Sequence, residues 1–211
     1  MPEVKSCVII AGGEVYEKIE IPENALVICA DCGYQHALAQ GIVPDVIVGD
    51  FDSYTGKLPD DPEIIHLPVE KDVSDTWFAV QYAEEHGCRE FAVYGTCGGE
   101  RVDHMIANLQ LLHAMAEKDL KAVFYYKNQI LLTVKNTSFR FSGRDYPEFS
   151  VFALSDQCIG VSISGAKYEL KSIRLSNTFP LGLSNCCTAD AFPEISVTEG
   201  TLLLVLTENQ K

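Results

Sequence analysis

Aspartates recur in this sequence where short apolar segments end. Asp31 follows the run ALVICA, Asp50 and Asp52 lie in VIVGDFDS, Asp75 lies in EKDVSDTW, and Asp103 lies in GGERVDHMIAN. Carboxylate oxygens are the ligands that Mg²⁺ prefers, together with water and substrate phosphates. These residue types at these places indicate metal-assisted phosphate chemistry.

The aspartates need compensating charge if they gather in one place. Like charges about 4 Å apart repel by about 4 kcal/mol at an effective dielectric constant of 20. Converging carboxylates therefore either rise in pKa or hold cations between them. Asp50 and Asp52 are two residues apart on an extended segment, so both point to the same side. This geometry suits one metal ion held by both acids, or two ions that share them.

Aspartates at such junctions also have an ordinary structural explanation. Asp caps helices and favours turns, so one Asp between a strand and a helix requires no function. Asp72 fits a helix cap almost as well as a ligand, and we rank it lowest. Five or six acids at successive junctions of one domain favour a functional cluster over independent caps.

Glycine-rich segments follow two of the apolar runs. Gly12-Gly13 allows either a close approach to a phosphate or a simple turn, and the sequence does not choose between them. GTCGGER indicates a phosphate site more strongly, because helix-start amides and a guanidinium follow the glycines. The sequence contains no GxxxxGK[ST], GxGxxG, GxSxG or HExxH motif, so P-loop, dinucleotide, serine hydrolase and zincin chemistry have no support. His104, beside Asp103, is interpreted as a packing or capping residue.

The elements that must position these residues alternate between strands and helices. Apolar runs predict strands at 6–11, 25–30, 46–48, 64–67, 91–94 and 122–126, and helices are predicted at 34–40, from 74 or 75 to 87, and at 103–118. The last helix is expected to present Ile106, Leu109, Leu112 and Met115 or Ala116 on one side. This alternation predicts a mostly parallel sheet, in which ligands bind beyond the carboxyl ends of the strands.

The second part of the chain has a different character. Short runs such as QILLTV, FSVFAL and TLLLVL are separated by Gly, Ser, Asn and Pro, which predicts an all-β sandwich or a small barrel. We expect a boundary near residues 127–136. The predicted organisation is an α/β domain at residues 1–130, followed by a β-sandwich domain at 131–211.

Composition excludes several classes of protein. The net charge of −14 opposes binding to nucleic acid phosphates. No apolar run approaches the roughly 20 residues of a membrane span, and no export signal is recognisable, so a cytoplasmic location is expected. The eight cysteines lack CxxC spacing and are interpreted as reduced, with most of them in the core.

Taken in order, these motifs resemble those of the thiamine pyrophosphokinases, in the bacterial form. The resemblance rests on GIVPDVIVGDFDS, EKDVSDT, GGERVDHMIANLQLL and the late LSN, and it spans nearly the whole chain. It implies an α/β domain that holds ATP and Mg²⁺ and a β-sandwich. It also implies a homodimer with thiamine in a shared cleft, and transfer of the pyrophosphoryl group of ATP to the thiamine hydroxyl, which gives thiamine diphosphate and AMP.

The resemblance also assigns residues by motif. The acidic metal–nucleotide cluster would be Asp31, Asp50, Asp52, Asp75 and Asp103. Lys71 and Arg101 match the family's basic positions, Ser74 replaces the usual Thr, Asn108 lies one turn beyond Asp103, and Ser184 and Asn185 match the Ser-Asn near the thiamine pocket.

The expected mechanism relies on alignment and charge neutralisation. Asp50, Asp52 and Asp75 would hold one or two Mg²⁺ ions, and Lys71 and Arg101 would stabilise phosphate charge. Asp75 and Asp103 both stay open as the proton acceptor. Tyr168 and Phe179 are candidates to stack on the thiamine cation, with plain core aromatics as the alternative. The competing hypotheses are a kinase for another small alcohol, an inactive binding protein, and aspartates that serve only as caps.

Overall fold

The computed structural model describes residues 5–51, 59, 61–98, 101–188 and 191–209 of the 211-residue chain. The chain forms two compact units. The first contains residues 1–111 and 119–127, and the second contains residues 112–118 and 128–211. No helix in the described part of the chain has the length and hydropathy that a membrane crossing requires.

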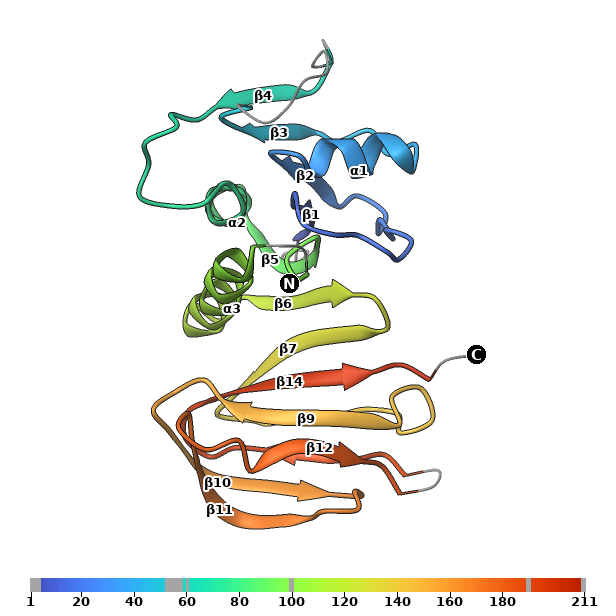
Figure 1. Cartoon of the computed structure of the whole chain (residues 1–211), viewed down its shortest axis with the longest axis vertical. Coiled ribbons are helices and arrows are strands. Elements are labelled where there is room, and N and C mark those ends of the chain that lie inside the picture. The colour runs from blue at the N-terminus through green and yellow to red at the C-terminus, as the bar shows by residue number, and fades with distance from the viewer. Residues whose placement is uncertain (1–4, 52–58, 60, 99–100, 189–190, 210–211) are drawn as a thin grey trace. The chain divides into compact units, whose positions relative to one another are not determined.

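The first unit is an α/β unit built on parallel strands. Its strands are β1 (Lys5–Ile10), β2 (Leu26–Ala30), β3 (Val46–Gly49), β4 (Glu63–His66), β5 (Cys88–Tyr94) and β6 (Lys121–Tyr126). They are ordered β6-β5-β1-β2-β3-β4, and all five pairings are parallel. The helices are α1 (Gly33–Ala39), α2 (Asp75–Glu85) and α3 (Val102–Glu117), with α1 on one side of these strands and α2 on the other (Figure 1). This confirms the predicted α/β class.

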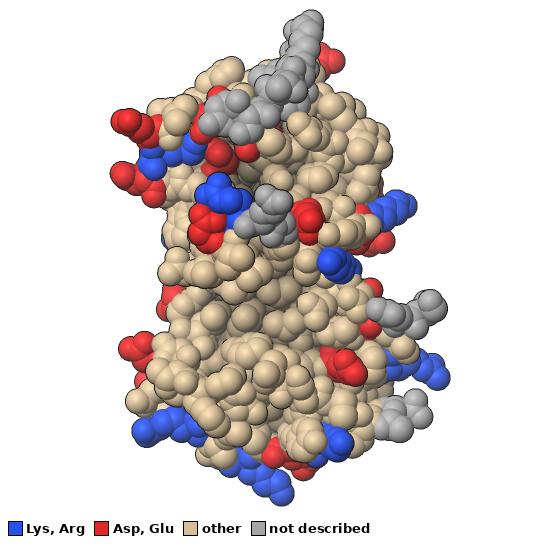
Figure 2. Space-filling model, in the orientation of Figure 1, with Lys and Arg blue, Asp and Glu red and all other residues tan. Residues whose placement is uncertain are grey.

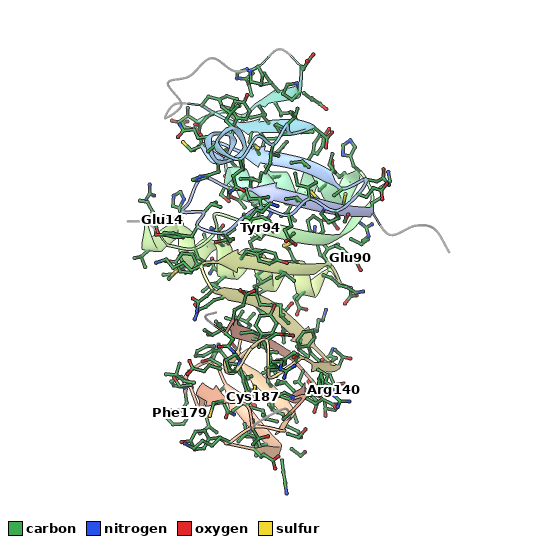
Figure 3. The ribbon with its side chains drawn as sticks, turned by 90° about the vertical axis from the view of Figure 1, so that its right-hand side faces the viewer. Glu14, Glu90, Tyr94, Arg140, Phe179 and Cys187 are labelled. Atoms are coloured by element: carbon green, nitrogen blue, oxygen red, sulfur yellow. The ribbon has the colours of Figure 1, made fainter. Side chains whose placement is uncertain are left out.

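The strands of the first unit form because their apolar runs are buried on both faces. The last four residues of both β1 and β2 are buried, as expected for a parallel sheet covered by helices. On the face toward α1, Tyr34 and Ala37 pack against β1, β2 and β3. Tyr94 belongs to the same core cluster and stacks on Tyr125 with ring centroids 4.6 Å apart (Figure 3). The central strands are thus fixed up to their carboxyl ends.

Helix α3 confirms the predicted stripe in its later turns, where Leu112, Met115 and Ala116 are buried. At its start the prediction differs, since Ile106 is 53% exposed while Asn108 is buried. The Asn108 side chain donates a hydrogen bond from Nδ2 to the backbone oxygen of Thr96 at 2.8 Å, which allows a polar residue to face inward. The predicted face, which included Ile106, is therefore wrong at the first turns, because apolar periodicity alone does not reveal a satisfied buried amide.

The second unit is antiparallel and forms two sheets. One sheet runs β12 (Gly182–Cys186), β9 (Glu148–Ala153), β14 (Thr201–Thr207) and β7 (Gln129–Lys135), and the other runs β11 (Leu170–Ser176), β10 (Gln157–Ser164), β13 (Glu194–Ser196) and β8 (Ser138–Arg140). This confirms the predicted antiparallel β-rich region. The sequence did not predict β12 or β13, since β12 reads GLSNC and β13 has only three residues.

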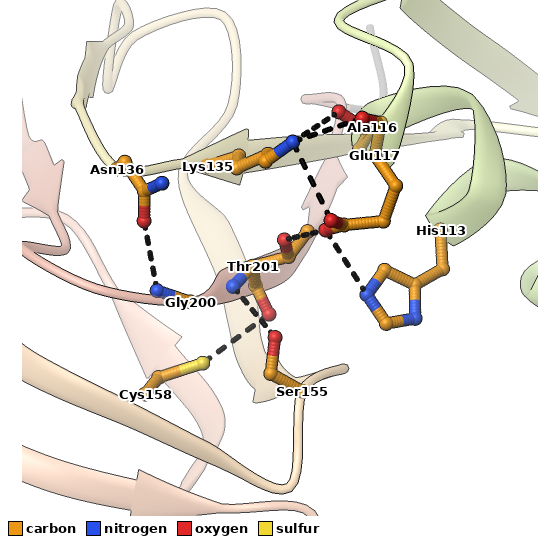
Figure 4. Close-up of polar contacts among 9 residues, drawn as sticks. All are labelled: His113, Ala116, Glu117, Lys135, Asn136, Ser155, Cys158, Gly200 and Thr201. Carbon is orange, nitrogen blue, oxygen red and sulfur yellow. Dashed lines mark hydrogen bonds and ion pairs between the residues drawn. The ribbon is translucent and has the colours of Figure 1, made fainter.

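A polar network holds the last turn of α3 within the second unit (Figure 4). Lys135 Nζ donates to the backbone oxygens of Ala116 and Glu117, both at 3.1 Å. Thr201 Oγ1 donates to Glu117 Oε1 at 2.9 Å, and this hydrogen bond, followed by the charge of Lys135, lowers the pKa of Glu117. A lysine that satisfies terminal helix carbonyls stabilises that helix end.

The surface is acidic, in agreement with the net charge of −14. Figure 2 shows one face of the molecule, and acidic and basic side chains lie side by side on the part of that face formed by the first unit. All eight cysteines are free thiols, and five of them are buried: Cys7, Cys29, Cys88, Cys97 and Cys158.

Candidate active site

The carboxyl ends of four parallel strands are tied together by backbone hydrogen bonds. Ala11 N donates to Tyr94 O at 2.9 Å, which joins the ends of β1 and β5, and Asp31 N donates to Val48 O at 2.7 Å, which joins β2 and β3. Such an edge is where parallel sheets bind ligands. The segments that carry the predicted site residues therefore start at strand ends whose positions are fixed by hydrogen bonds.

Two glycines allow the turns after β1 and β5 to touch. Gly13 N donates to Gly95 O at 2.9 Å. A Cβ on Gly13 would lie 2.4 Å from Gly95 O, and a Cβ on Gly95 would lie 2.3 Å from Ala11 O. Gly95 also has a positive φ of 71°. Glycine is required at both positions, so that backbone rather than side chain lines the adjoining pocket.

A pocket of about 480 Å³ opens at this edge, entirely within the first unit. Five of the predicted site residues line it: Asp31, Ser74, Asp75, Arg101 and Asn108. The turn glycines Gly12, Gly13, Gly95 and Gly98 line it as well. Glycine turns, carboxylates and a guanidinium around one cavity provide backbone amides and charge for an anionic ligand and its counter-cation.

Asp50 and Asp75 share one partner, Lys71. Lys71 Nζ lies 2.8 Å from Asp50 Oδ2 in a hydrogen bond and 3.1 Å from Asp75 Oδ1 in an ion pair. The three side chains are only 14%, 14% and 19% exposed for Lys71, Asp50 and Asp75. Asp50 follows β3 and Asp75 begins α2, so Lys71 connects a strand end to a helix start.

The pKa values of this triad reflect crowded negative charge. Burial raises the pKa of Asp75, against the effect of Lys71, and the nearby charges of Asp50 and Asp31 raise it further. Burial opposes the charge on Lys71, but the two carboxylates outweigh burial and raise the pKa of its ammonium. The charges of Asp31 and Asp50 thus both act on Asp75, and Lys71 lies between Asp50 and Asp75.

Asp31 adds a strained backbone and an unsatisfied oxygen to the cluster. Its φ is 50°, in the left-handed region that few residues other than glycine adopt. Its Oδ1 is buried and has no hydrogen-bond partner among the described residues. Strain and an orphaned buried acceptor at one residue are typical of functional sites.

Arg101 and Asp103 pair with each other at the start of α3. Arg101 Nε donates to Asp103 Oδ1 at 3.0 Å, and Nη2 donates to Oδ2 at 2.7 Å. The hydrogen bonds from Arg101 lower the pKa of Asp103 to about 2. Both side chains are about two-thirds exposed, at 66% and 65%, and only Arg101 lines the pocket. Asp103 is therefore placed beside the pocket as the partner of its arginine.

The remaining predicted residues have separate places. The Ser74 hydroxyl caps α2 by accepting from Trp77 N at 3.2 Å. Ser184 and Asn185 lie on β12 in the second unit, where the buried Asn185 exchanges two hydrogen bonds with the backbone of Tyr168, at 3.1 and 2.8 Å. Phe179 in the same unit is 65% exposed and points away from the ribbon (Figure 3). Asn185 thus holds the segment that presents Tyr168.

Sequence reasoning missed several residues that line the pocket, among them His36 and Glu14. His36, on α1, has Nε2 2.7 Å from Gly13 O, so this nitrogen carries the hydrogen and donates. Glu14, labelled in Figure 3, also lines the pocket. His104, interpreted as a packing or capping residue, lines the pocket and is exposed. The only signal for His36 was its position three residues into the helix after Asp31-Cys32-Gly33.

The fit of a divalent cation rests on oxygen donors. Asp52, Gly99 and Glu100 lie outside the described residues. Within the described residues no group of three or more His, Cys, Asp or Glu gathers as a metal cluster. Asp50 and Asp75 nevertheless contact the same cation, Lys71, and Asp31 Oδ1 lacks a partner. Hard carboxylate oxygens around a bound cation suit Mg²⁺ better than they suit softer metals.

The fold and the pocket define a protein that joins an α/β ligand-binding unit to an antiparallel β unit. The profile of "Thiamin pyrophosphokinase, catalytic domain" matches residues 19–124, and that of "Thiamin pyrophosphokinase, vitamin B1 binding domain" matches residues 136–202. The chain belongs to the thiamin pyrophosphokinase family, whose enzymes form thiamine diphosphate by pyrophosphoryl transfer from ATP.

Individual relatives agree with this assignment. A thiamine pyrophosphokinase of Bacillus subtilis is 27% identical over 195 residues, which cover 86% of this chain and 89% of the relative. The crystal structure of the Bacillus subtilis enzyme matches with a TM-score of 0.86 at 24% identity, over 97% of this chain and all of that one. That of Geobacillus thermodenitrificans matches with a TM-score of 0.81 at 23% identity, over 99% of each chain.

Proposed function

We propose that this chain is a Mg²⁺-dependent, homodimeric thiamine pyrophosphokinase that binds Mg-ATP in the pocket of the first unit. One observation carries the proposal: Asp31, Asp75 and Arg101, which all belong to the segment that the catalytic-domain profile matches, line one cavity together with the turn glycines. Thiamine recognition is assigned to the second unit, including Ser184 and Asn185, on the basis of the second profile. The homodimer and the cytoplasmic location stay predictions.

In the proposed reaction the thiamine hydroxyl oxygen attacks the β-phosphorus of ATP. A new P–O bond forms, the bond between the β-phosphorus and the oxygen bridging to the α-phosphate breaks, and AMP leaves with that oxygen. Bound Mg²⁺ would neutralise phosphate charge and help to align the groups. Asp50, Asp75 and, outside the described residues, Asp52 are the residues proposed to hold it.

The chain's own groups orient the phosphates and accept the proton. Arg101, which lines the pocket, provides donors for phosphate oxygens, as does the backbone of the glycine turns. The low pKa of Asp103, about 2, makes this carboxylate a weak base. Asp75 stays the other candidate for the group that takes the hydroxyl proton.

The decisive experiment identifies the nucleotide product. With Mg-ATP and thiamine, the proposal requires AMP and thiamine diphosphate in equal amounts, separated by chromatography. ADP with thiamine monophosphate would instead show simple phosphoryl transfer. The absence of any turnover, with thiamine binding intact by calorimetry, would favour an inactive binding protein.

A further inference from the structure

Lys71 lies where a divalent cation would have to be held if Asp50 and Asp75 are both ligands. Its Nζ contacts one oxygen of each carboxylate, at 2.8 and 3.1 Å. The ammonium is shielded from solvent, with a side-chain exposure of 14%. A divalent ion bound to these same two oxygens would lie within a few ångströms of the ammonium, and like charges that close repel, so the two cations compete.

One lysine does not balance the charge around it. Lys71 contacts the carboxylates of Asp50 and Asp75, and the carboxylate of Asp31 also acts on Asp75. Asp31 Oδ1 is also buried without a hydrogen-bond partner among the described residues. A single positive charge therefore leaves residual negative potential, and a divalent cation would neutralise it more completely.

The Lys71 ammonium can also move away from its position between Asp50 and Asp75. Lysine carries its charge on a flexible four-carbon stem, as a point charge without fixed directional geometry. Its contact with Asp75 is the longer of the two, at 3.1 Å against 2.8 Å for the contact with Asp50. The Asp75 side chain also borders the pocket, so a displaced ammonium stays near bound phosphate.

We infer that Lys71 is an exchangeable internal cation: it holds Asp50 and Asp75 in place before a divalent ion binds, and that ion displaces it. The displaced ammonium then becomes available to substrate phosphate. Lys71 is thus a positioning residue for the carboxylates first and a phosphate ligand second. The inference rests on the proposed function for the role of the site, but the cation exchange itself requires no turnover.

The test compares Mn²⁺ binding without nucleotide in the wild type and in Lys71→Met, by the electron paramagnetic resonance of free Mn²⁺. Because Lys71→Met removes the competing ammonium, the dissociation constant of Mn²⁺ at this site should fall by about tenfold or more. Tighter binding of the ion would then accompany the loss of a residue that is expected to aid catalysis. Asp75→Asn in the Lys71→Met background should abolish the gain. Lys121→Met, on the exposed Lys121–Glu90 pair, is the matched control for the change in net charge.

Equal or weaker Mn²⁺ binding in Lys71→Met would overturn the inference, because Lys71 would then not compete for the carboxylates. Absence of any binding in that variant would overturn it as well. Circular dichroism establishes that the variant is folded before titration.

A second measurement uses the unaltered protein. Reductive methylation by formaldehyde and a borane, followed by mass spectrometry, should modify Lys71 several-fold faster in Mg²⁺ and leave the rate at Lys121 unchanged. Unchanged methylation of Lys71 would contradict displacement. Product analysis separates the two proposals: cation exchange without AMP formation would refute the function alone, and AMP formation without exchange would refute this inference alone.

Discussion

Two shielded lysines in this molecule hold their partners for different reasons. Lys135 donates to the carbonyls of Ala116 and Glu117 and pairs with Glu117, whose carboxylate also accepts from Thr201. Lys71 lies between two carboxylates in a cluster that still contains an unsatisfied oxygen on Asp31. The first lysine completes a network, whereas the second leaves charge unbalanced.

The two lysines show how a structural polar group can be distinguished from a functional one. Satisfied buried networks make a fold specific and rigid, while partly satisfied ones need an explanation beyond stability. Burial alone does not separate the two lysines, since their side chains are 14% and 23% exposed. The chemistry of the partners does separate them, and substitutions in the two regions should therefore have opposite signatures.

The largest effect is expected for Asp50→Asn. Loss of one carboxylate from the cluster should lower kcat/KM by about 10³-fold, because the variant removes charge that the reaction needs while keeping the side-chain shape. AMP release measures the activity, and thermal unfolding should change little. Asp61→Asn, at an exposed position between β3 and β4, is the control and should retain activity. Near-normal turnover of Asp50→Asn would show that the Asp50 carboxylate is not needed for the reaction.

Lys135→Met should show the reverse signature. It leaves helix carbonyls without their donor, so the free energy of unfolding should fall by about 1–3 kcal/mol. The kcat value measured well below the melting temperature should stay within about twofold, since the network lies in the second unit. Denaturant titration and AMP release measure the two quantities. A large fall in kcat without a loss of stability would show that Lys135 also serves catalysis.

His36→Leu should have an intermediate effect on binding. Without its hydrogen bond to Gly13 O, the turn after β1 loses a constraint at the pocket wall. A bond of this kind contributes about 1 kcal/mol, so KM for Mg-ATP should rise about fivefold while kcat changes little. His36→Gln keeps an N–H donor and should recover part of the loss. Equal KM values in both variants and the wild type would limit His36 to packing.

The smallest effect is a change in titration at the start of α3. In Arg101→Gln the pKa of the Asp103 carboxyl should rise from about 2 toward its ordinary value of 3.8. The folded pKa is depressed in the wild type, so the pair's contribution to stability is complete above about pH 4 and is lost as pH falls through about 2. Carbon-detected NMR of the Asp103 carboxyl measures this shift. An unchanged midpoint would refute the pairing in solution.

The sequence predicted most of the first unit because its strands are apolar runs that end at polar turns. Expected strands at 6–11 and 25–30 correspond to β1 and β2 within one residue at each end. The α/β class and the β-rich second part follow from the same periodicity. The strand β12 escaped prediction because its pairing with β9 is a nonlocal property that GLSNC does not encode by pattern.

The candidate site was partly accessible from sequence for a similar reason. Parallel strands bring their carboxyl ends to one edge, so acids after β2 and β3 were expected to approach the start of α2. The bridge by Lys71 between two acids, and the hydrogen bond from His36 to Gly13, depend on side-chain directions across elements. Local sequence patterns carry no information about such directions.

At position 31, thermal stability and activity favour different residues, because the backbone of Asp31 is left-handed. At φ 50° glycine is relaxed where a carboxylate is strained, and such strain costs about 1 kcal/mol. A library of variants screened only for survival of heating should therefore enrich Gly at position 31. The same library screened for thiamine diphosphate production should discard it. The residue found at position 31 would then show whether a variant was selected for thermal stability or for activity.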